Sequence, residues 1–243
     1  MSLRAAQEID ASMDNAEFDK FAAEYREMHA ANIGASGETP DYFAEYKVRD
    51  IANLVAGEPS LKPSRILDFG AGIGTSVPHL RKYFPSAALT CLDVSQKSLE
   101  IGRSRFPGEA EFQLFDGKTV PLANDSIDLV FVACVFHHIP HSEHVGLLAE
   151  LRRVISPGGA LFLYEHNPYN PLTVRAVNTC PLDENAVLIR PENMLRTFRQ
   201  AGFNFPQLRY RVFFPRFLSK LRSLENYLPW CPLGAQYSVL APK

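Results

Sequence analysis

The chain has 243 residues, of which 25 are Lys or Arg and 27 are Asp or Glu, so its formal net charge is −2. With 46% hydrophobic and 21% charged residues, its composition is that of a globular protein and excludes a disordered or fibrous one. A charge this close to zero argues against a role that needs a basic field, such as nucleic-acid binding. The length predicts one domain with at most a small appendage.

Cysteine spacing and the lack of long apolar runs bear on where the protein works. The four cysteines, at positions 91, 134, 180 and 231, form no CxxC pair, and two of them lie in apolar runs. Buried, reduced thiols and a cytoplasmic location are therefore predicted. No signal peptide is expected, and the longest apolar run, Leu129 to Phe136, is too short to span a membrane.

Two amphipathic helices are expected near the N-terminus. The apolar spacing predicts one from about Asn15 to Met28 and a second from Asp41 to Val55. Glycine and proline residues between positions 57 and 63 then interrupt the chain. We therefore divide the chain into an N-terminal helical cap, residues 1–63, and a core, residues 64–243.

The core alternates short apolar runs with amphipathic stretches, which is the pattern of βαβ units in a parallel sheet. Helices are expected to start near residues 74, 95 and 141, and a further helix covers residues 191–201. The expected strands are 65–69, 88–92, 110–114, 127–132, 160–165, 207–214 and 236–240. The prediction is an α/β fold with a doubly wound sheet.

An amphipathic stretch, residues 213–230, separates the last two expected strands. It mixes apolar side chains with Arg216, Lys220 and Arg222. Such a stretch could rest on a membrane surface or cover an apolar substrate. We favour a helical insertion near 215–230 that packs on the core, because three basic residues are few for stable membrane binding.

The most informative segment runs from Ile66 to Gly74, with the sequence ILDFGAGIG. An apolar strand leads into a glycine-rich turn and then a helix, the arrangement that binds ligands at the carboxyl end of a strand in a doubly wound sheet. Glycines let the backbone approach a ligand, and the N–H groups at a helix start suit an anionic group. The dinucleotide fingerprint GxGxxG does not fit, because Thr75 or Val77 stands where its third glycine would be.

This segment resembles motif I of the class I S-adenosylmethionine-dependent methyltransferases. Four further segments follow in that family's order: Asp93-Val94, Asp116-Gly117, residues 126–139 and residues 151–159. The resemblance covers about residues 65–165 and is closest to the small-molecule branch that includes quinone-biosynthesis enzymes. It implies a Rossmann-like sheet of seven strands, mostly parallel with an antiparallel last strand, and N-terminal helices that cap the cofactor.

The resemblance also implies that S-adenosyl-L-methionine is the cofactor and which residues bind it. Asp93 would accept hydrogen bonds from the ribose hydroxyls, and Asp116 would bond the adenine amino group. Asp68 would either contact the cofactor's ammonium or bond the N–H groups of the turn. Lys47, with its tyrosine neighbours, could reach the cofactor carboxylate. The remaining expected contacts are Gly70, Ala71, Gly72, Val94, Gly117 and Cys134.

The chemistry of a sulfonium cofactor determines which catalytic residues are needed. Its methyl group is already electrophilic, so the protein must mainly hold the acceptor in line and exclude water. A base is needed only for an acceptor that is protonated at neutral pH. His138, His137 and Glu165 directly follow expected strands and are the catalytic candidates, with His138 first. The alternatives are backbone-bonded helix-entry histidines and a Glu165 that shapes the pocket.

Four histidines, at positions 137, 138, 141 and 144, raise the question of a metal site. No Cys or Asp nearby in the sequence completes a ligand set, although Glu143 is close. We therefore expect no functional metal and a solvated helix start instead.

These patterns together predict a cytoplasmic methyltransferase that acts on a small molecule, in one interpretation an apolar or lipid-like one. No nucleic-acid partner and no stable membrane insertion are expected. The alternatives are an NAD(P)-dependent oxidoreductase and a non-catalytic protein that binds S-adenosylmethionine. The broken dinucleotide fingerprint argues against the first, and the intact turn and acids are compatible with the second. Neither the acceptor nor the oligomeric state follows from the sequence.

Overall fold

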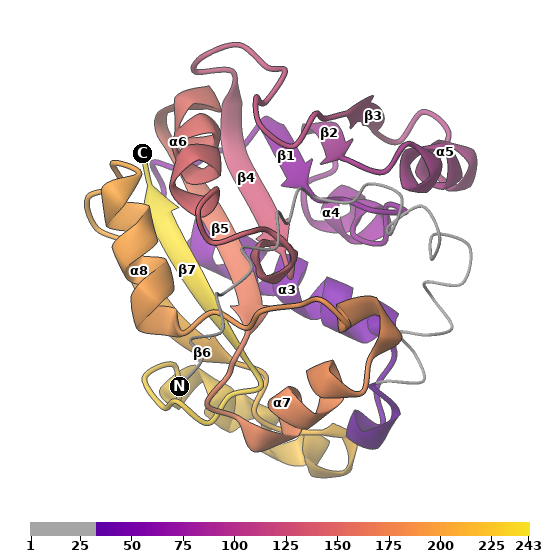
Figure 1. Cartoon of the computed structure of the whole chain (residues 1–243), viewed down its shortest axis with the longest axis vertical. Helices are drawn as coiled ribbons and strands as arrows, with labels where there is room; N and C mark the ends of the chain where they lie inside the picture. Colours follow the sequence, from indigo (N-terminus) through magenta and orange to yellow (C-terminus); the bar gives the residue numbers. More distant parts are fainter. Residues whose placement is uncertain (1–32) are drawn as a thin grey trace, which may run out of the picture.

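A seven-stranded sheet forms the centre of the molecule (Figure 1). The computed structural model describes residues 33–243, so the helix expected from Asn15 to Met28 lies outside the described residues. The sheet order is β3-β2-β1-β4-β5-β7-β6. The strands are β1 (Arg65–Phe69), β2 (Ala88–Asp93), β3 (Glu111–Leu114), β4 (Ile127–Ala133), β5 (Ile155–His166), β6 (Gln207–Arg211) and β7 (Gln236–Pro242).

Strand directions follow the expected pattern. The first five strands pair in parallel, and β7 pairs antiparallel with both β5 and β6. The seven strands and the antiparallel last strand are therefore confirmed. The main departure is at β5, which begins five residues earlier than expected, because residues 155–159 continue the strand.

Helices cover both faces of the sheet. The α-helices are α3 (Pro40–Ala56), α4 (Val77–Tyr83), α5 (Gln96–Arg105), α6 (His144–Val154), α7 (Pro171–Asn178) and α8 (Pro191–Gln200). Short 3-10 helices are η1 (Gly34–Ser36), η2 (Phe136–His138), η3 (Pro181–Asp183) and η4 (Arg216–Tyr227). Local signals set their starts: the Thr39 hydroxyl accepts a hydrogen bond from Tyr42 N, and Pro40 occupies the first turn of α3.

Two apolar clusters hold the layers together, one on each face of the sheet. Successive residues of β1 point to opposite faces, so Leu67 packs with residues of α6 and α8, and Ile66 packs with residues of α3, α4 and α5. Because helices cover both faces, the central strands consist of continuous apolar runs.

The described part of the predicted cap is built into this core. Val48 and Ile51 of α3 are fully buried in the same cluster as the strands. Asp50 accepts hydrogen bonds from the Tyr164 hydroxyl (2.8 Å) and from Arg211 Nε (2.7 Å). Helix α3 is thus tied to β5 and β6, while its N-terminal half remains free to border the space beyond the strand ends.

The insertion between β6 and β7 is helical, but its packing differs from the prediction. None of the residues in η4 is buried, and Phe217 and Tyr227 are 80% and 76% exposed. Instead, η4 makes polar contacts with α3, with the residues before α3 and with the residues that follow β6. Glu225 accepts hydrogen bonds from the Tyr46 hydroxyl and Phe213 N, and Arg222 pairs with Glu38 at 2.6 Å. Polar contacts, rather than an apolar face, attach this segment.

Helix α7 was not expected from the sequence. It follows β5 and lies beyond the carboxyl end of that strand (Figure 1). The Asn170 side chain accepts hydrogen bonds from Leu172 N and Thr173 N, and Pro171 occupies the first turn. Among residues 33–243, no helix is long and apolar enough to cross a membrane.

Candidate active site

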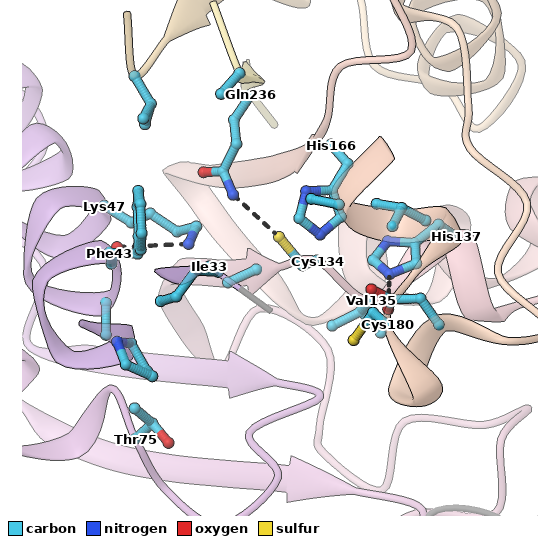
Figure 2. Close-up of a pocket in the computed structure, with 18 of the residues that line it drawn as sticks. Ile33, Phe43, Lys47, Thr75, Cys134, Val135, His137, His166, Cys180 and Gln236 are labelled. Atoms are coloured by element: carbon cyan, nitrogen blue, oxygen red, sulfur yellow. Dashed lines mark hydrogen bonds and ion pairs between the residues drawn. The ribbon is translucent and has the colours of Figure 1, made fainter. Parts of the chain in front are cut away.

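The strands of the sheet end at a cavity of about 770 Å³. It lies where the strand order reverses between β1 and β4, the usual ligand position in an open α/β sheet. The turns after β1, β2 and β4 form its floor, and α3, α7 and the chain before η4 form its sides. Figure 2 shows how residues from both ends of the chain, such as Lys47 and Gln236, face this space.

The glycine turn after β1 places bare backbone against the cavity. Gly70 has φ +73°, and a Cβ there would lie 2.4 Å from Val135 Cγ2, so only glycine fits. Gly72 has φ +53°, but no atom of residues 33–243 lies within 4 Å of where its Cβ would be. Gly72 N donates a hydrogen bond to Asp93 Oδ2 at 2.7 Å. The turn is therefore fixed by its contacts with Val135 and Asp93, and it is open towards the cavity at Gly72.

Asp68 is a buried carboxylate at this turn, and it is 2% exposed. Among the described residues, its Oδ2 has no hydrogen-bond partner, although the side chain lines the cavity. Burial, and then the charge of Asp93, raise the pKa of Asp68 to about 7. The N–H groups of Gly70 and Ala71 donate to Leu92 O instead. This environment suits a cationic ligand group and does not support a role in bonding the turn.

The other cofactor residues expected from the sequence divide into two groups. Ala71, Asp93, Val94 and Cys134 line the cavity with the glycines. Asp116 and Gly117 do not, and Phe115 lines it instead. Asp116 is exposed, and its Oδ1 accepts hydrogen bonds from Lys118 N and Thr119 N, both at 2.8 Å. The structure therefore uses this carboxylate to close a turn.

Cys134 follows β4 in an unusual backbone conformation. Its φ is +58°, which is uncommon for a residue with a Cβ and is often found at functional sites. Cys134 N donates to Tyr164 O at 2.8 Å, and its Sγ accepts from Gln236 Nε2 at 3.5 Å. Burial raises the pKa of the thiol, so the side chain stays neutral and acts as a small apolar wall.

Glu165 organises the turn after β4 from behind. Its Oε1 accepts hydrogen bonds from Val135 N (3.1 Å) and Phe136 N (2.7 Å), and its Oε2 lies 2.6 Å from His137 Nδ1. The side chain is 1% exposed and does not line the cavity. Glu165 is therefore a positioning residue. Both of its oxygens already accept hydrogen bonds from internal donors, which favours the expected alternative, a Glu165 that shapes the site, over proton transfer.

His137 lies between two carboxylates. Its Nδ1 faces Glu165, and its Nε2 lies 3.5 Å from Asp183 Oδ1. Burial lowers the pKa of His137, but Glu165 and Asp183 outweigh burial and raise it to about 10. At neutral pH this imidazole is protonated and cannot accept a proton. The structure thus argues against His137 as a base.

His138 and His166 face the cavity beside this pair. Burial and the charge of His137 lower the pKa of His138 to about 3 and that of His166 to about 4, so both are neutral. His138 Nε2 lies 3.5 Å from the same oxygen of Asp183. His138 reaches the cavity as expected, but so low a pKa makes it a weak base.

Comparison with known proteins gives a match in the part of the chain that carries this site. Residues 67–163 match the family model described as a methyltransferase domain. This range contains the glycine turn and the turn after β4. The match falls on the part of the chain whose motifs resemble those of the class I S-adenosylmethionine-dependent methyltransferases.

Two curated proteins are similar to this chain over part of their length. The trans-aconitate 2-methyltransferase of Methylobacterium nodulans is 37% identical over 121 residues, 49% of this chain and 45% of the relative. The malonyl-[acyl-carrier protein] O-methyltransferase of Methylococcus capsulatus is 36% identical over 113 residues, 45% of this chain and 40% of the relative. The matched part spans less than half of either relative.

Solved methyltransferase structures share the fold. A SAM-dependent methyltransferase from Thermotoga maritima superposes with a TM-score of 0.65 at 17% identity, covering 96% of this chain and 100% of that one. Another, from Aquifex aeolicus, gives 0.63 at 16%, covering 92% and 97%. The Rossmann-like architecture extends over nearly the whole chain, beyond the residues that match the family model.

Several residues at the cavity have no strong signal in the sequence. Asp183 ends η3 after a loop without periodicity, and Gln236 begins β7, far from the family motifs. Helix α7 could have been found, because Asn170-Pro171 is a typical helix start. Lys47 lies on an expected helix, but nothing in the pattern of that helix separates it from a surface lysine. Tyr46, its neighbour, bonds Glu225 and does not line the cavity.

Proposed function

We propose that this chain transfers the methyl group of S-adenosylmethionine to a small-molecule acceptor that carries a carboxylate. The observation that carries the cofactor half of the proposal is the unpartnered, buried Asp68 carboxylate beside the open turn at Gly72. A buried acid with no partner is costly, and a ligand's ammonium group would offset that cost.

In this proposal the cofactor lies across the ends of β1 and β2. Asp68 holds its ammonium group, Asp93 accepts hydrogen bonds from its ribose hydroxyls, and Gly72 gives it room. When bound, the cofactor supplies an electrophilic methyl group on its sulfonium. The protein's remaining task is to hold the acceptor in line and to keep water out. Helix α7 and the chain before η4 border the cavity, and these two segments would keep water out.

Lys47 supports an anionic acceptor. Its side chain is 7% exposed and lines the cavity, and Nζ donates a long hydrogen bond of 3.4 Å to Phe43 O. Among residues 33–243, no carboxylate lies within ion-pair distance of this ammonium (the salt bridges involve other residues). A buried charge without a partner favours a ligand of opposite charge. Trans-aconitate and malonyl, in the names of the two relatives, are both carboxylic acid derivatives.

A carboxylate acceptor also agrees with the weak bases at the site. A carboxylic acid is ionised at neutral pH, so its oxygen attacks the methyl group without a general base. His137 and His138 then need not accept a proton. The apolar part of the acceptor would lie against Phe213, Phe214 and Phe217, which line the same cavity. We also place the protein in a reducing, cytoplasmic compartment, because none of its four cysteines forms a disulfide bond in residues 33–243.

The test is a methyl-transfer assay with the full chain, S-adenosylmethionine and a panel of small di- and tricarboxylic acids. Each acid is paired with its amide and its alcohol, and S-adenosylhomocysteine release is measured. We expect turnover with acids and none with their matched analogues. Transfer to the alcohols or amides alone would reject the carboxylate. No transfer in spite of cofactor binding would favour a non-catalytic binding protein.

The variant Lys47→Met distinguishes binding of the acceptor from binding of the cofactor, because methionine has nearly the length of the lysine side chain but carries no charge. We expect the KM for the acid to rise at least about tenfold, the effect of losing one charged hydrogen bond, while the Kd of S-adenosylhomocysteine stays unchanged. If the Kd of S-adenosylhomocysteine rises instead, Lys47 serves the cofactor carboxylate and not the acceptor.

A further inference from the structure

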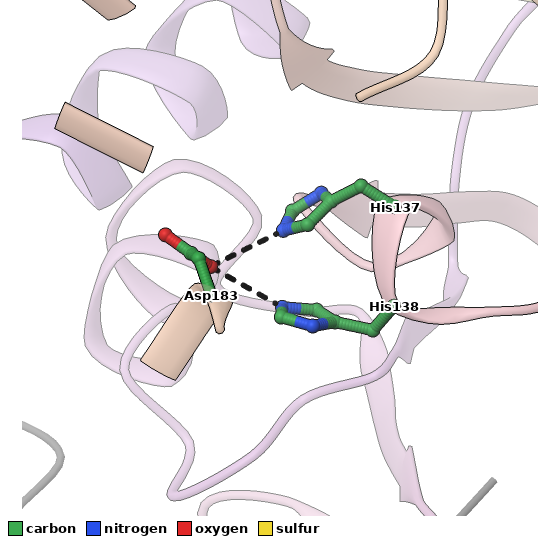
Figure 3. Close-up of side chains that lie close together, drawn as sticks. All are labelled: His137, His138 and Asp183. Atoms are coloured by element: carbon green, nitrogen blue, oxygen red, sulfur yellow. Dashed lines mark ion pairs between the residues drawn. The ribbon is translucent and has the colours of Figure 1, made fainter. Parts of the chain in front are cut away.

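Three side chains meet at the wall of the cavity in a way that the proposed methyl transfer does not require. His137, His138 and Asp183 each direct one ligand atom to a common point, and these atoms all lie within 4.8 Å of one another (Figure 3). The two histidines belong to η2, and Asp183 ends η3. All three residues line the cavity.

The spacing of these atoms is that of metal ligands. Asp183 Oδ1 lies 3.5 Å from His137 Nε2 and 3.5 Å from His138 Nε2, at the outer limit for a hydrogen bond in both cases. Nitrogen and oxygen ligands at their usual distances from a tetrahedral Zn²⁺ lie about 3.4 Å apart. The two separations from Asp183 Oδ1 match this value, and the two imidazole nitrogens lie within 4.8 Å of each other.

A second carboxylate orients one of the histidines from behind. Glu165 Oε2 lies 2.6 Å from His137 Nδ1, which leaves Nε2 directed at Asp183. A ligating histidine almost always donates its other N–H to such a partner, which fixes the ring and makes the ligand more basic. Glu165 is itself fixed by Val135 N and Phe136 N, so the ring cannot turn without losing its hydrogen bond to this carboxylate.

We propose that His137, His138 and Asp183 form a binding site for a divalent transition-metal ion, with Zn²⁺ as the reference ion. Two imidazoles and one carboxylate form a donor set that such ions prefer over Mg²⁺ or Ca²⁺. Binding would displace the proton that His137 otherwise holds. Three protein ligands leave a fourth position open, and it faces the cavity, as in catalytic rather than structural sites.

The open position adds a second contact for the acceptor, a step that rests on the proposed function. An acceptor carboxylate held by Lys47 could place an oxygen on the metal and so be fixed in orientation. Metal binding itself does not depend on methyl transfer. It is therefore measured without cofactor or acceptor, so that the two proposals can fail separately.

The experiment uses the full chain, stripped with a chelator and dialysed, and titrated with Zn²⁺ by calorimetry and with Co²⁺ by visible absorption. We expect one saturable ion per chain and a tetrahedral Co²⁺ spectrum. Asp183→Asn and His138→Gln should each lower the affinity at least about tenfold, since even outer-shell changes cost that much. His141→Gln is the control, because this exposed histidine lies outside the cluster and should leave the affinity unchanged.

Folding of each variant is checked by circular dichroism and thermal unfolding, and the use of two ligand variants covers the case in which one does not fold. Absence of saturable binding to the wild-type chain would overturn the proposal. So would binding that survives in both folded ligand variants, or that is lost in His141→Gln. In those cases the cluster is an ion network of one imidazolium between two carboxylates.

Discussion

Asp68 combines deep burial with an unused carboxylate oxygen, and this makes cofactor binding depend on pH. Its pKa in the free protein is raised to about 7, and only the ionised form attracts an ammonium group. We expect the affinity for S-adenosylhomocysteine to fall about tenfold per pH unit below 7. In Asp68→Asn the affinity should be lower at pH 7 and nearly independent of pH. Calorimetry between about pH 5 and 7 measures both, and a slope that persists in the variant would contradict the assignment.

The same raised pKa affects the stability of the free protein. The pKa of Asp68 lies near 7 when folded, against the reference value of 3.8, so the folded state binds the proton more tightly. The free energy of unfolding should therefore decrease as the pH rises from about 4 to 7. Asp68→Asn should reduce this decrease. Urea unfolding at the two ends of that range tests this, and an identical decrease in the variant would contradict it.

Gly70 and Gly72 share a turn but should respond differently to a methyl group. In Gly70→Ala the new Cβ meets Val135 Cγ2 at 2.4 Å and the φ of +73° is strained, so we expect a loss of roughly 2–4 kcal/mol in unfolding free energy. In Gly72→Ala the new Cβ meets no atom of the described part of the chain, so the change should cost only about 1–2 kcal/mol, from its left-handed backbone. If the cofactor fills the space beside Gly72, this variant should nevertheless lose cofactor affinity at least tenfold. Unchanged affinity in Gly72→Ala would place the cofactor elsewhere.

At the scale of secondary structure, one acid fixes the start of two strands far from the cavity. Asp128 Oδ2 accepts hydrogen bonds from Ser64 N and Arg65 N, both at 3.0 Å, and its Oδ1 accepts from Ser156 Oγ. We expect Asp128→Ala to lower the unfolding free energy by roughly 2–4 kcal/mol, because it leaves these backbone donors unpaired. Arg65→Ala is the control. Its side chain is 44% exposed, so losing that ion pair should cost less than about 1 kcal/mol. Equal losses in chemical denaturation would contradict this explanation.

The strands were predictable because their apolar runs are continuous and bounded by clear turns. Helices such as α6 were predictable from the spacing of Leu147, Leu148 and Leu151 on one face. Helix α7 has only eight residues, too few to display a period, although its Asn-Pro start was a usable signal. The apolar spacing of η4 suggested a buried face, but polar contacts hold this segment and its apolar side chains stay exposed.

At the scale of the whole molecule, the site joins segments that the sequence keeps far apart. The glycine turn, Asp93 and the two histidines were found because they belong to motifs tied to strand ends. Asp183 was missed because a fold, not a motif, brings it beside His137. Asp116 stands at the position in the sequence that the family motif predicts, but it does not line the cavity. Its carboxylate instead accepts hydrogen bonds from the backbone of its own turn. Local sequence thus predicts which turns carry a site better than which way each side chain faces.

The proposed methyl transfer depends on S-adenosylmethionine binding in the cavity, and titration of the wild-type chain with S-adenosylhomocysteine measures that binding. We predict one site per chain, and ligand at a hundred times its Kd should stabilise the fold by about 2.7 kcal/mol. Asp93→Asn should weaken binding at least tenfold. Glu111→Gln, a change at an exposed acid on β3 outside the cavity, should not. Absence of binding, or tight binding of NAD(H) in its place, would contradict the account.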